Sequence, residues 1–191
     1  MKKYFLLTVF TLTAALSANA QSLDKMQWFN EPESYTIKNG TLEMEVPAQT
    51  DYWRIAHYGF TVDDGPFLYT TVGGEFEAKI KVSGDYKVRF DQAGMMIRKD
   101  PSDWSVIELK EPIPFLWLKA VRRLDAIELY YSFDDKEYTM MRTLWMQDNC
   151  PLMVGPVAAC PDGQGFKAVF SHFKVKHLPD QRRVEWLMNN Q

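Results

Sequence analysis

Pairs of carboxylates are the first residues in this sequence whose spacing could support chemistry. Glu43 and Glu45 stand two positions apart in TLEMEV, and on a β-strand that spacing puts both side chains on one face, about 7 Å apart. Retaining glycosidases hold their acid and nucleophile about 5.5 Å apart, so this pair could begin a glycoside-cleaving site. Ala48 occupies the position where sandwich-fold glucanases carry a third carboxylate. A solvated strand face is the better interpretation, because exposed carboxylates on strands need no special explanation.

The other polar residues lack the spacing that metal or nucleophile chemistry requires. The three histidines lie far apart or on a strand without ligand spacing, and no Cys or His pair completes a set of four ligands. No serine lies in a G-x-S-x-G motif, so a nucleophilic serine is unsupported. Glu75 and Glu77 repeat the two-residue spacing but alternate with Lys79 and Lys81, as on a charge-balanced surface. These residues identify no catalytic group, no metal site and no cofactor, which favours a protein that is not an enzyme.

Aromatic residues, 14% of the chain, are a stronger indication of function. In an exported β-sandwich, an exposed Trp or Tyr beside Asp, Asn, Gln or Arg can stack on a sugar ring while its neighbours hold the hydroxyl groups. Most of the rings must fill the core, because both sheets of a sandwich contribute to it. Trp53 and Trp104 are expected to reach solvent in a groove, because charged residues flank both. Asp51 and Arg54 lie close to Trp53, and Asp103 precedes Trp104.

Strands must position these residues, because apolar and polar side chains alternate with period two along much of the chain. Turn signals such as Ser83-Gly84-Asp85 separate the runs, and about ten short strands without helical patterns between them are typical of an all-β sandwich. Residues 184, 187 and 188 are apolar at helical spacing and predict a short C-terminal helix. The predicted strands are TLEMEV, GEFEAKIKV, YKVRF, AGMMIR, WSVIEL, FLWLKAVRR, AIELYYSF, EYTMMRTLW, LMVGPVAA and KAVFSHFKVKHL.

The first twenty residues have the organisation of a cleavable signal peptide. Lys2 and Lys3 precede an apolar run over residues 4–16, and Ala18-Asn19-Ala20 is the small-x-small pattern that a signal peptidase cuts. The run is shorter than the ~20 residues that span a bilayer, so we expect cleavage after Ala20 and no membrane association afterwards. The sequence predicts a signal peptide over residues 1–20, one domain over residues 21–191, and a periplasmic or secreted product.

Composition and the two cysteines further limit the class of protein and the bonds that it can form. Hydrophobic residues make up 46% of the chain and the formal net charge is -3, which argues against disorder and against a nucleic-acid partner. The segment between Cys150 and Cys160 reads as a strand, which would hold the two α-carbons about 33 Å apart. A disulfide needs them within about 7 Å. Both cysteines are therefore expected to be unbridged, unless Gly155-Pro156 folds the segment back on itself.

Six segments, in this chain order, carry a resemblance to a known family. They are TDYWR (50–54), FDQAGMMIRKD (90–100), SDWS (102–105), LWLKAVRR (116–123), YYSFDDKEYTMMR (130–142) and VGPVAACPDGQGF (154–166). Over about residues 28–175 the chain resembles the DUF1349 family, which includes a yeast protein named for the regulation of enolase. The resemblance implies a concanavalin A-like lectin/glucanase fold, an antiparallel β-sandwich of the jelly-roll type.

The resemblance also implies a missing strand pair. The family pattern has a stretch resembling WIKTGIE and then a VVT strand between the DQAG and SDWS motifs. Here Asp100-Pro101 runs directly into Ser102. Losing two strands from a sheet would leave either a gap or a new unpaired edge.

Polar residues within the matched motifs have two interpretations. They could bind a ligand together with Trp53, or they could be structural, with Asp91 and Gln92 closing a bulge while Arg98 pairs with an acid to hold the sheet. No established catalytic residue comes with the resemblance. The candidate binding residues are Trp53, Asp91, Gln92, Arg98, Asp103, Trp104 and Arg122.

Three functions are compatible with these residues. The first is an exported, non-catalytic module that binds carbohydrate on the concave sheet. The second is a glycoside hydrolase-like enzyme, which would need Glu43 with Glu45, or Asp91 with Glu108, to converge across a cleft. The third is a protein-interaction domain, whose mark would be a flat apolar patch. A sandwich fold alone does not choose among them.

Overall fold

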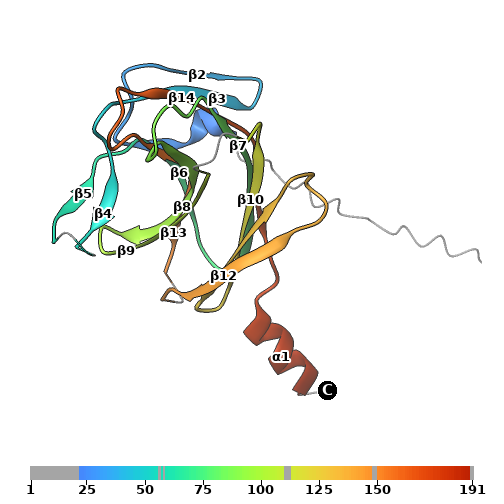
Figure 1. Cartoon of the computed structure of the whole chain (residues 1–191). Helices are drawn as coiled ribbons and strands as arrows, with labels where there is room; N and C mark the ends of the chain where they lie inside the picture. The colour runs from blue at the N-terminus through green and yellow to red at the C-terminus, as the bar shows by residue number, and fades with distance from the viewer. Residues whose placement is uncertain (1–21, 56, 58, 110–112, 148–149, 190–191) are drawn as a thin grey trace, which may run out of the picture.

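The fold is known from a computed structural model that describes residues 22–55, 57, 59–109, 113–147 and 150–189. The described residues form an all-β sandwich of two antiparallel sheets (Figure 1). One sheet has five strands in the order β1-β6-β13-β8-β9, and the other has seven in the order β12-β11-β10-β7-β14-β3-β2. A separate two-stranded hairpin, β4-β5, stands outside both sheets. The strands are β1 (Gln27–Phe29), β2 (Tyr35–Lys38), β3 (Thr41–Val46), β4 (Tyr52–Arg54), β5 (Thr61–Asp63), β6 (Phe67–Val72), β7 (Phe76–Gly84), β8 (Gln92–Asp100), β9 (Asp103–Leu109), β10 (Leu116–Arg123), β11 (Ala126–Ser132), β12 (Thr139–Trp145), β13 (Leu152–Ala159) and β14 (Phe166–His177).

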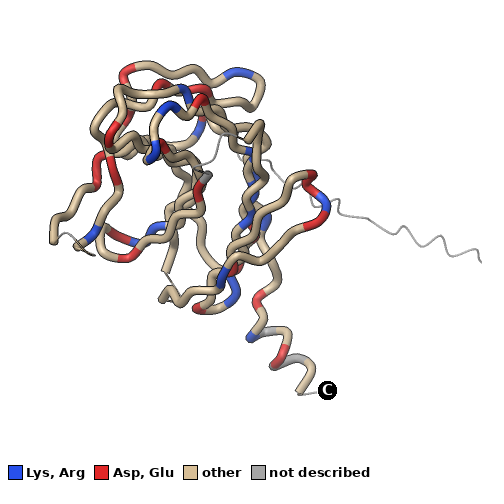
Figure 2. Tube along the Cα trace, in the orientation of Figure 1, with Lys and Arg blue, Asp and Glu red and all other residues tan. Residues whose placement is uncertain are grey.

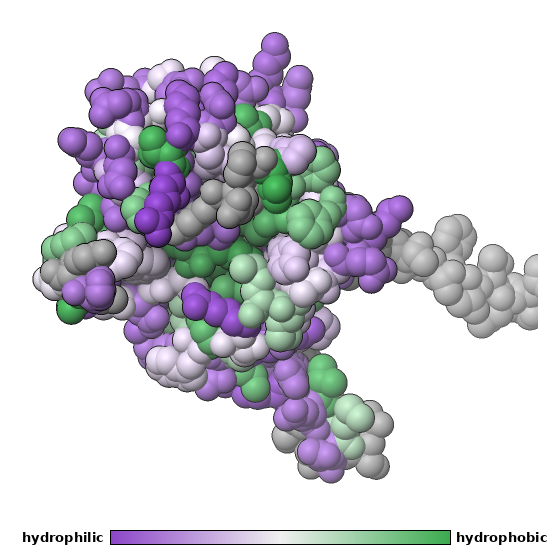
Figure 3. Space-filling model, in the orientation of Figure 1, coloured by the Kyte–Doolittle hydropathy of each residue, from purple (hydrophilic) through white to green (hydrophobic). Residues whose placement is uncertain are grey.

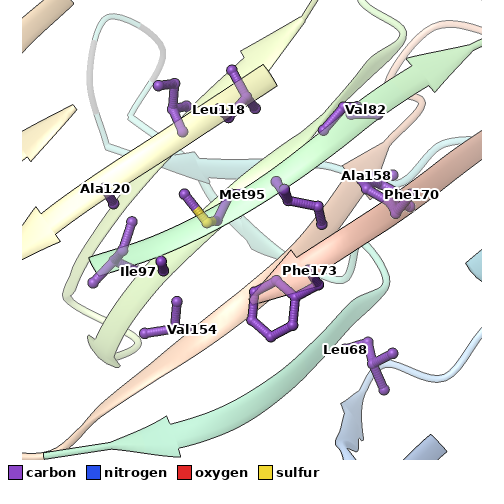
Figure 4. Packing of buried hydrophobic residues seen from close by; sticks show 14 of the residues in the cluster. Leu68, Val82, Met95, Ile97, Leu118, Ala120, Val154, Ala158, Phe170 and Phe173 are labelled. Carbon is purple, nitrogen blue, oxygen red and sulfur yellow. The ribbon is translucent and has the colours of Figure 1, made fainter. Parts of the chain in front are cut away.

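The core lies between the two sheets and follows from the period-two patterns. In β7, Phe76, Ala78, Ile80 and Val82 are all fully buried, while the residues between them are partly exposed. β8 contributes Ala93, Met95 and Ile97 to the same cluster, and these face Leu118 and Phe170 of the seven-stranded sheet (Figure 4). Because alternate residues of each strand point to opposite faces, the even-numbered residues of β8 face away from the core, toward the outer surface of the five-stranded sheet.

Most predicted strands are confirmed, and one is wrong. TLEMEV and LMVGPVAA are strands over the predicted residues, and the C-terminal helix is present as α1 (Gln181–Asn189). Residues 86–90, YKVRF, form no strand but a turn. The cause is Asp91, whose Oδ2 accepts hydrogen bonds from the backbone N–H groups of Lys87 (2.7 Å) and Val88 (3.0 Å).

The two cysteines are unbridged, as expected from the extended segment between them. Cys160 is fully buried, and its thiol donates a hydrogen bond to the other oxygen of Asp91 at 3.0 Å. Burial and this contact with the Asp91 carboxylate both raise the pKa of the Cys160 thiol, burial more strongly. Cys160 therefore stays a protonated donor, and Asp91, itself fully buried, has its acceptor positions filled by the protein.

The sheets are unequal in width, and the difference falls at one edge of the sandwich. β9 ends the five-stranded sheet, and β8 passes into it through the short turn at Pro101-Ser102. In the wider sheet, the edge strand β12 is exposed along most of its length, with Met141 52% and Trp145 67% exposed. An uncovered β12 is the consequence expected if strands are missing next to β9, because extra strands there would lie over it.

Two further features concern the ends of the chain. Glu75 is buried and accepts hydrogen bonds from Arg123 (2.7 Å) and from the Gln181 N–H (3.0 Å), so it fixes the start of α1. No helix among the described residues is both long and apolar enough to cross a membrane. The predicted signal peptide, residues 1–20, lies outside the described residues and stays a prediction.

Replacing Asp91 with Ala is expected to lower the free energy of unfolding by about 3 kcal/mol. The change removes the side chain that accepts three hydrogen bonds and leaves buried donors unpaired. Urea unfolding followed by tryptophan fluorescence would measure it. Asp85→Ala, which removes an exposed acid from the same loop, should change the value by less than about 0.5 kcal/mol. Equal effects of the two substitutions would contradict the structural role of Asp91.

Candidate functional site

The β4-β5 hairpin forms one wall of the candidate site. Its two strands are only three residues long and pair from Tyr52 with Asp63 to Arg54 with Thr61. A hairpin this short has little stability of its own, so contacts with the five-stranded sheet must hold it. Figure 1 shows it standing away from the sandwich, beside β9.

An ion pair provides the main contact between hairpin and sheet. Arg98 of β8 is 1% exposed, and its two terminal nitrogens donate to the two carboxylate oxygens of Asp63 at 2.5 and 2.7 Å. The hydrogen bonds to Asp63 raise the pKa of the Arg98 guanidinium, although burial works against them. The ring of Phe29 packs 4.5 Å below the guanidinium carbon. This two-point geometry is the strongest form of side-chain ion pair, and it sets both the position and the angle of β5.

Tyr52 provides a second contact, at the base of the hairpin. Its ring is 7% exposed and its hydroxyl donates to the Gly65 carbonyl at 2.5 Å. Burial raises the pKa of this phenol well above its usual range. A side chain at Gly65 would come within 2.6 Å of the Tyr52 ring and of the Ala158 carbonyl, so the hairpin can close here only on a glycine. Trp104 of β9 packs edge-on against Tyr52, with ring centres 6.0 Å apart.

A groove of about 1100 Å³ lies between the hairpin and the outer face of β8, β9 and β13. In the space-filling view, apolar residues gather at the hollowed centre of this face, with hydrophilic residues around them (Figure 3). Trp53 and Phe60, whose ring centres are 6.1 Å apart, line the hairpin side. The groove is lined by Gln49, Asp51, Tyr52, Trp53, Arg54, Phe60, Val62, Phe90, Gln92, Ala93, Gly94, Trp104, Ser105, Val106, Glu108, Arg142, Val157, Ala158, Ala159, Pro161 and Asp162.

Polar groups of both signs lie among these apolar walls. The Gln92 amide donates to Asp51 at 3.2 Å, and the same carboxylate oxygen accepts the Tyr52 N–H at 2.7 Å. Glu108 of β9 adds a second carboxylate to the lining, and Arg142 of β12 adds a guanidinium. Carboxylates, an amide and guanidinium groups beside aromatic rings can hold the hydroxyls and the apolar face of a polyhydroxyl ligand at the same time.

The structure brings together three of the seven predicted site residues. Trp53, Gln92 and Trp104 all line the groove, and both tryptophans are partly exposed. Asp103 lies next to them on β9 but outside the groove lining, 3.9 Å from the Lys99 ammonium. Arg98 lies behind the groove, where it holds the hairpin.

Asp91 and Arg122 lie in structural contacts outside the groove. Asp91 closes the turn before β8, as described above. Arg122 is on the other sheet, 2% exposed, and donates to the carbonyls of Cys150 (2.7 Å) and Gln147 (3.0 Å). It therefore joins the segment before β13 to β10 and does not neighbour the β8 residues, contrary to the sequence-based expectation.

Sequence reasoning missed other residues of the site. Asp63, the partner of Arg98, and Phe60 both belong to the β4-β5 hairpin, which was not predicted as an element. The short TDYWR and FTVDDG segments on either side of residues 55–59 were the available signal. Arg142 comes from the edge of the opposite sheet, and no local pattern places it here.

The carboxylate pairs considered for glycoside cleavage are not assembled in the groove. Glu43 and Glu45 lie exposed on the outer face of the seven-stranded sheet, and Glu43 pairs with Lys167 at 3.5 Å. Of Asp91 and Glu108, only Glu108 lines the groove, because Asp91 is buried in its turn. Within the described part of the chain, no group of three His, Cys, Asp or Glu side chains is placed to hold a metal ion.

A two-sheet antiparallel sandwich with a groove on its narrower sheet defines the class of protein. The family model described as "Protein of unknown function (DUF1349)" matches residues 28–102 and 98–178, and the chain belongs to that family. The two matched stretches meet at the turn between β8 and β9, where the family pattern implies a missing strand pair.

Similar proteins agree with this family. The chain is 29% identical over 178 residues to "Regulation of enolase protein 1" of Saccharomyces cerevisiae, covering 80% of this chain and 90% of that protein. A crystal structure of a functionally unknown S. cerevisiae protein superposes with a TM-score of 0.75 at 27% identity, covering 82% of this chain and 98% of that chain.

Solved structures of more distant proteins share the fold. The GH43 protein BlXynB of Bacillus licheniformis has a TM-score of 0.60 at 15% identity, covering 85% of this chain and 40% of that chain. Xylan β-1,4-xylosidase of Bacillus halodurans C-125 has a TM-score of 0.56 at 15% identity, covering 82% of this chain and 38% of that chain. At this identity the likeness concerns the fold alone, which is the sandwich predicted from the sequence.

Removing either partner of the ion pair between Arg98 and Asp63 should lower stability, but by different amounts. Asp63→Asn should lower the free energy of unfolding by about 3 kcal/mol, because it leaves a buried guanidinium without its counter-charge. Arg98→Met should cost less, because the Asp63 side chain is 24% exposed and can turn to water. Thermal or urea unfolding of both variants measures the difference. Asp103→Asn, at the partly exposed 3.9 Å contact with Lys99, is the control and should change stability little. A larger loss in Arg98→Met than in Asp63→Asn would contradict this assignment.

Proposed function

We propose that the protein is an exported, non-catalytic module that binds carbohydrate in the groove between the β4-β5 hairpin and the five-stranded sheet. The observation that carries the proposal is the placement of Trp53 and Trp104. They come from different elements, both are partly exposed, and both line one groove together with Gln92, Asp51 and Glu108. Aromatic faces beside hydrogen-bonding side chains are the combination that sugar rings require.

The groove favours a ligand longer than one sugar. Its volume of about 1100 Å³ exceeds that of a typical small-molecule pocket, and it is lined from Gln49 before the hairpin to Arg142 on β12. Both tryptophans contact neighbouring rings, Trp104 that of Tyr52 and Trp53 that of Phe60. A preformed site of this kind loses little conformational entropy on binding.

A role as an enzyme is less well supported. The two carboxylate pairs that would carry glycoside cleavage do not converge, since one lies on the far sheet and the other is split by the burial of Asp91. A protein-interaction role is favoured by one observation, the exposed apolar side chains Met140, Met141 and Trp145 on β12. That strand is a second candidate surface, although its Arg142 belongs to the groove lining.

Xylan-type chains are the first ligands to test. Two proteins with this fold are a GH43 protein and a xylan β-1,4-xylosidase by their own names. Their likeness is one of fold, so the ligand assignment for this chain rests on its own groove. The export part of the proposal rests on the signal-peptide pattern of residues 1–20.

Trp53→Ala and Trp104→Ala should each weaken glycan binding about tenfold, because each removes one stacking surface. A glycan array containing xylo-, arabino- and cello-oligosaccharides, followed by calorimetry on the best ligand, measures the effect. Trp145→Ala is the matched control, since that side chain is 67% exposed on β12 and lies outside the groove lining. Near-UV circular dichroism checks that each variant is folded. No binding by the folded protein, or equal loss in all three variants, would refute the groove as the binding site.

Export makes a separate prediction. Expression of the whole chain in a bacterial host should give a product whose first residue is Gln21, found in the periplasm or the medium. N-terminal sequencing and cell fractionation test it, with Ala18→Arg and Ala20→Arg together as the control that blocks cleavage. An uncleaved protein retained in the cytoplasm would overturn the exported role without affecting the groove.

A further inference from the structure

The outer face of the seven-stranded sheet carries a second group of charged and aromatic side chains, on the opposite sheet from the groove. Lys79 of β7 is the direct cross-strand partner of Lys119 on β10 and of Lys174 on β14. The residues that flank Lys79, Ala78 and Ile80, are fully buried, so the lysines point outward. Figure 2 shows basic positions in succession along β7 and β10. We call Lys79, Lys81, Trp117, Lys119 and Lys174 the cationic strip.

A row of three lysines across adjacent strands costs stability, because like charges directly opposite each other repel. Lys79 forms an ion pair with Asp135 at 2.6 Å. In the part of the chain that the structure describes, Lys81, Lys119 and Lys174 have no carboxylate within ion-pair distance. An anionic ligand would relieve this repulsion.

Aromatic rings take the place of counter-charges. The Lys119 ammonium lies 3.9 Å from the ring centre of Tyr138 and 4.7 Å from that of Tyr130. The Lys81 ammonium lies 3.8 Å from the ring centre of Phe115. A cation over an aromatic face is held at modest energy, so these rings position both ammonium groups at the surface.

Trp117 gives the strip a stacking surface. It is the cross-strand partner of Lys81, it is partly exposed, and the Lys79 and Lys81 ammonium groups lie 5.2 and 5.9 Å from its ring centre. The edge contact with His172, at 5.1 Å between ring centres, fixes its orientation. An aromatic ring bordered by two cations matches a sugar ring that carries a carboxylate.

The charge density of the strip favours a polysaccharide over a nucleic acid. Glu77 and Glu128 also point outward on this face, opposite each other across Val121, and Asp135 borders it. Duplex DNA carries a negative charge every 1.7 Å or so, and these carboxylates would repel it. A sugar chain with about one carboxylate per ring can place its charges on the lysines and avoid the acids.

We propose that the cationic strip binds an acidic polysaccharide, one whose sugars carry carboxylates. The strip is separate from the groove, so each of the two proposed sites can be tested independently of the other. It would let one small protein hold a neutral and an acidic sugar chain on opposite faces.

Binding to polygalacturonate by calorimetry and affinity electrophoresis tests the proposal, at low ionic strength and again at physiological ionic strength. The Lys81→Gln/Lys119→Gln double variant should bind about tenfold more weakly at low ionic strength, and Trp117→Ala should lose a similar factor. Raising the salt concentration should lower the polygalacturonate affinity of the unmodified protein more than that of the double variant, because screening acts on the charges that the variant lacks.

The matched control removes two lysines elsewhere on the same sheet. Lys38→Gln/Lys167→Gln changes the net charge equally and should bind as the protein does. Trp104→Ala should also leave polygalacturonate binding unchanged, which separates this site from the groove. The proposal fails if the folded protein does not bind polygalacturonate. It also fails if both lysine pairs lose binding equally, or if duplex DNA or phosphatidylserine vesicles bind more tightly than polygalacturonate.

Discussion

The candidate groove depends on one interaction, the two-point ion pair between Arg98 and Asp63. The β4-β5 hairpin consists of two three-residue strands and could not hold its position by strand pairing alone. Arg98 is an outward-facing residue of β8 that the hairpin covers. The hairpin can bury this guanidinium because it also brings the Asp63 carboxylate to it. The Arg98 Nε has no hydrogen-bond partner among the described residues, which makes the guanidinium depend still more on Asp63. Sheet, ion pair and hairpin together therefore form the wall on which Trp53 is carried.

A second junction fixes the end of the groove, where three distant segments meet at Cys160. The Cys160 N–H donates to the Thr50 carbonyl at 3.1 Å, and its thiol donates to Asp91 at 3.0 Å. Residues 51–54, 92–94 and 157–159 continue from these three points, and all three stretches contribute to the groove lining. Buried structural groups therefore set the positions of the exposed ones. Asp91 and Arg98 matter to the site because they build it, and neither is among the residues that line the groove.

Much of the sandwich could be predicted from the sequence, because a strand with one buried face shows its period in its own residues. TLEMEV and the long β7 pattern are of this kind. YKVRF failed because its alternation is overridden by Asp91, a residue outside the segment that captures its N–H groups. The β4-β5 hairpin was missed because three-residue strands are too short to show a period. For the site, Trp53 and Trp104 were found from residue type and flanking charge, and Gln92 from the motifs that carry the family resemblance. Arg122 lies away from these residues, and Arg142 lies beside them in the groove. Both positions depend on which sheet each strand joins, and no local sequence pattern encodes that.

The sharpest test of the groove as a carbohydrate site is an NMR titration of the six tryptophan indole N–H signals with xylo-oligosaccharide, polygalacturonate being added in a separate titration. We expect the oligosaccharide to shift the signals of Trp53 and Trp104 in a saturable way and to leave that of Trp145 in place. An Asp63→Asn variant that remains folded should lose the shift of Trp53 first, because its wall is no longer held. Saturable shifts confined to Trp145, or to Trp117, with Trp53 and Trp104 unmoved, would show that the sugar binds elsewhere and that the groove is not the carbohydrate site.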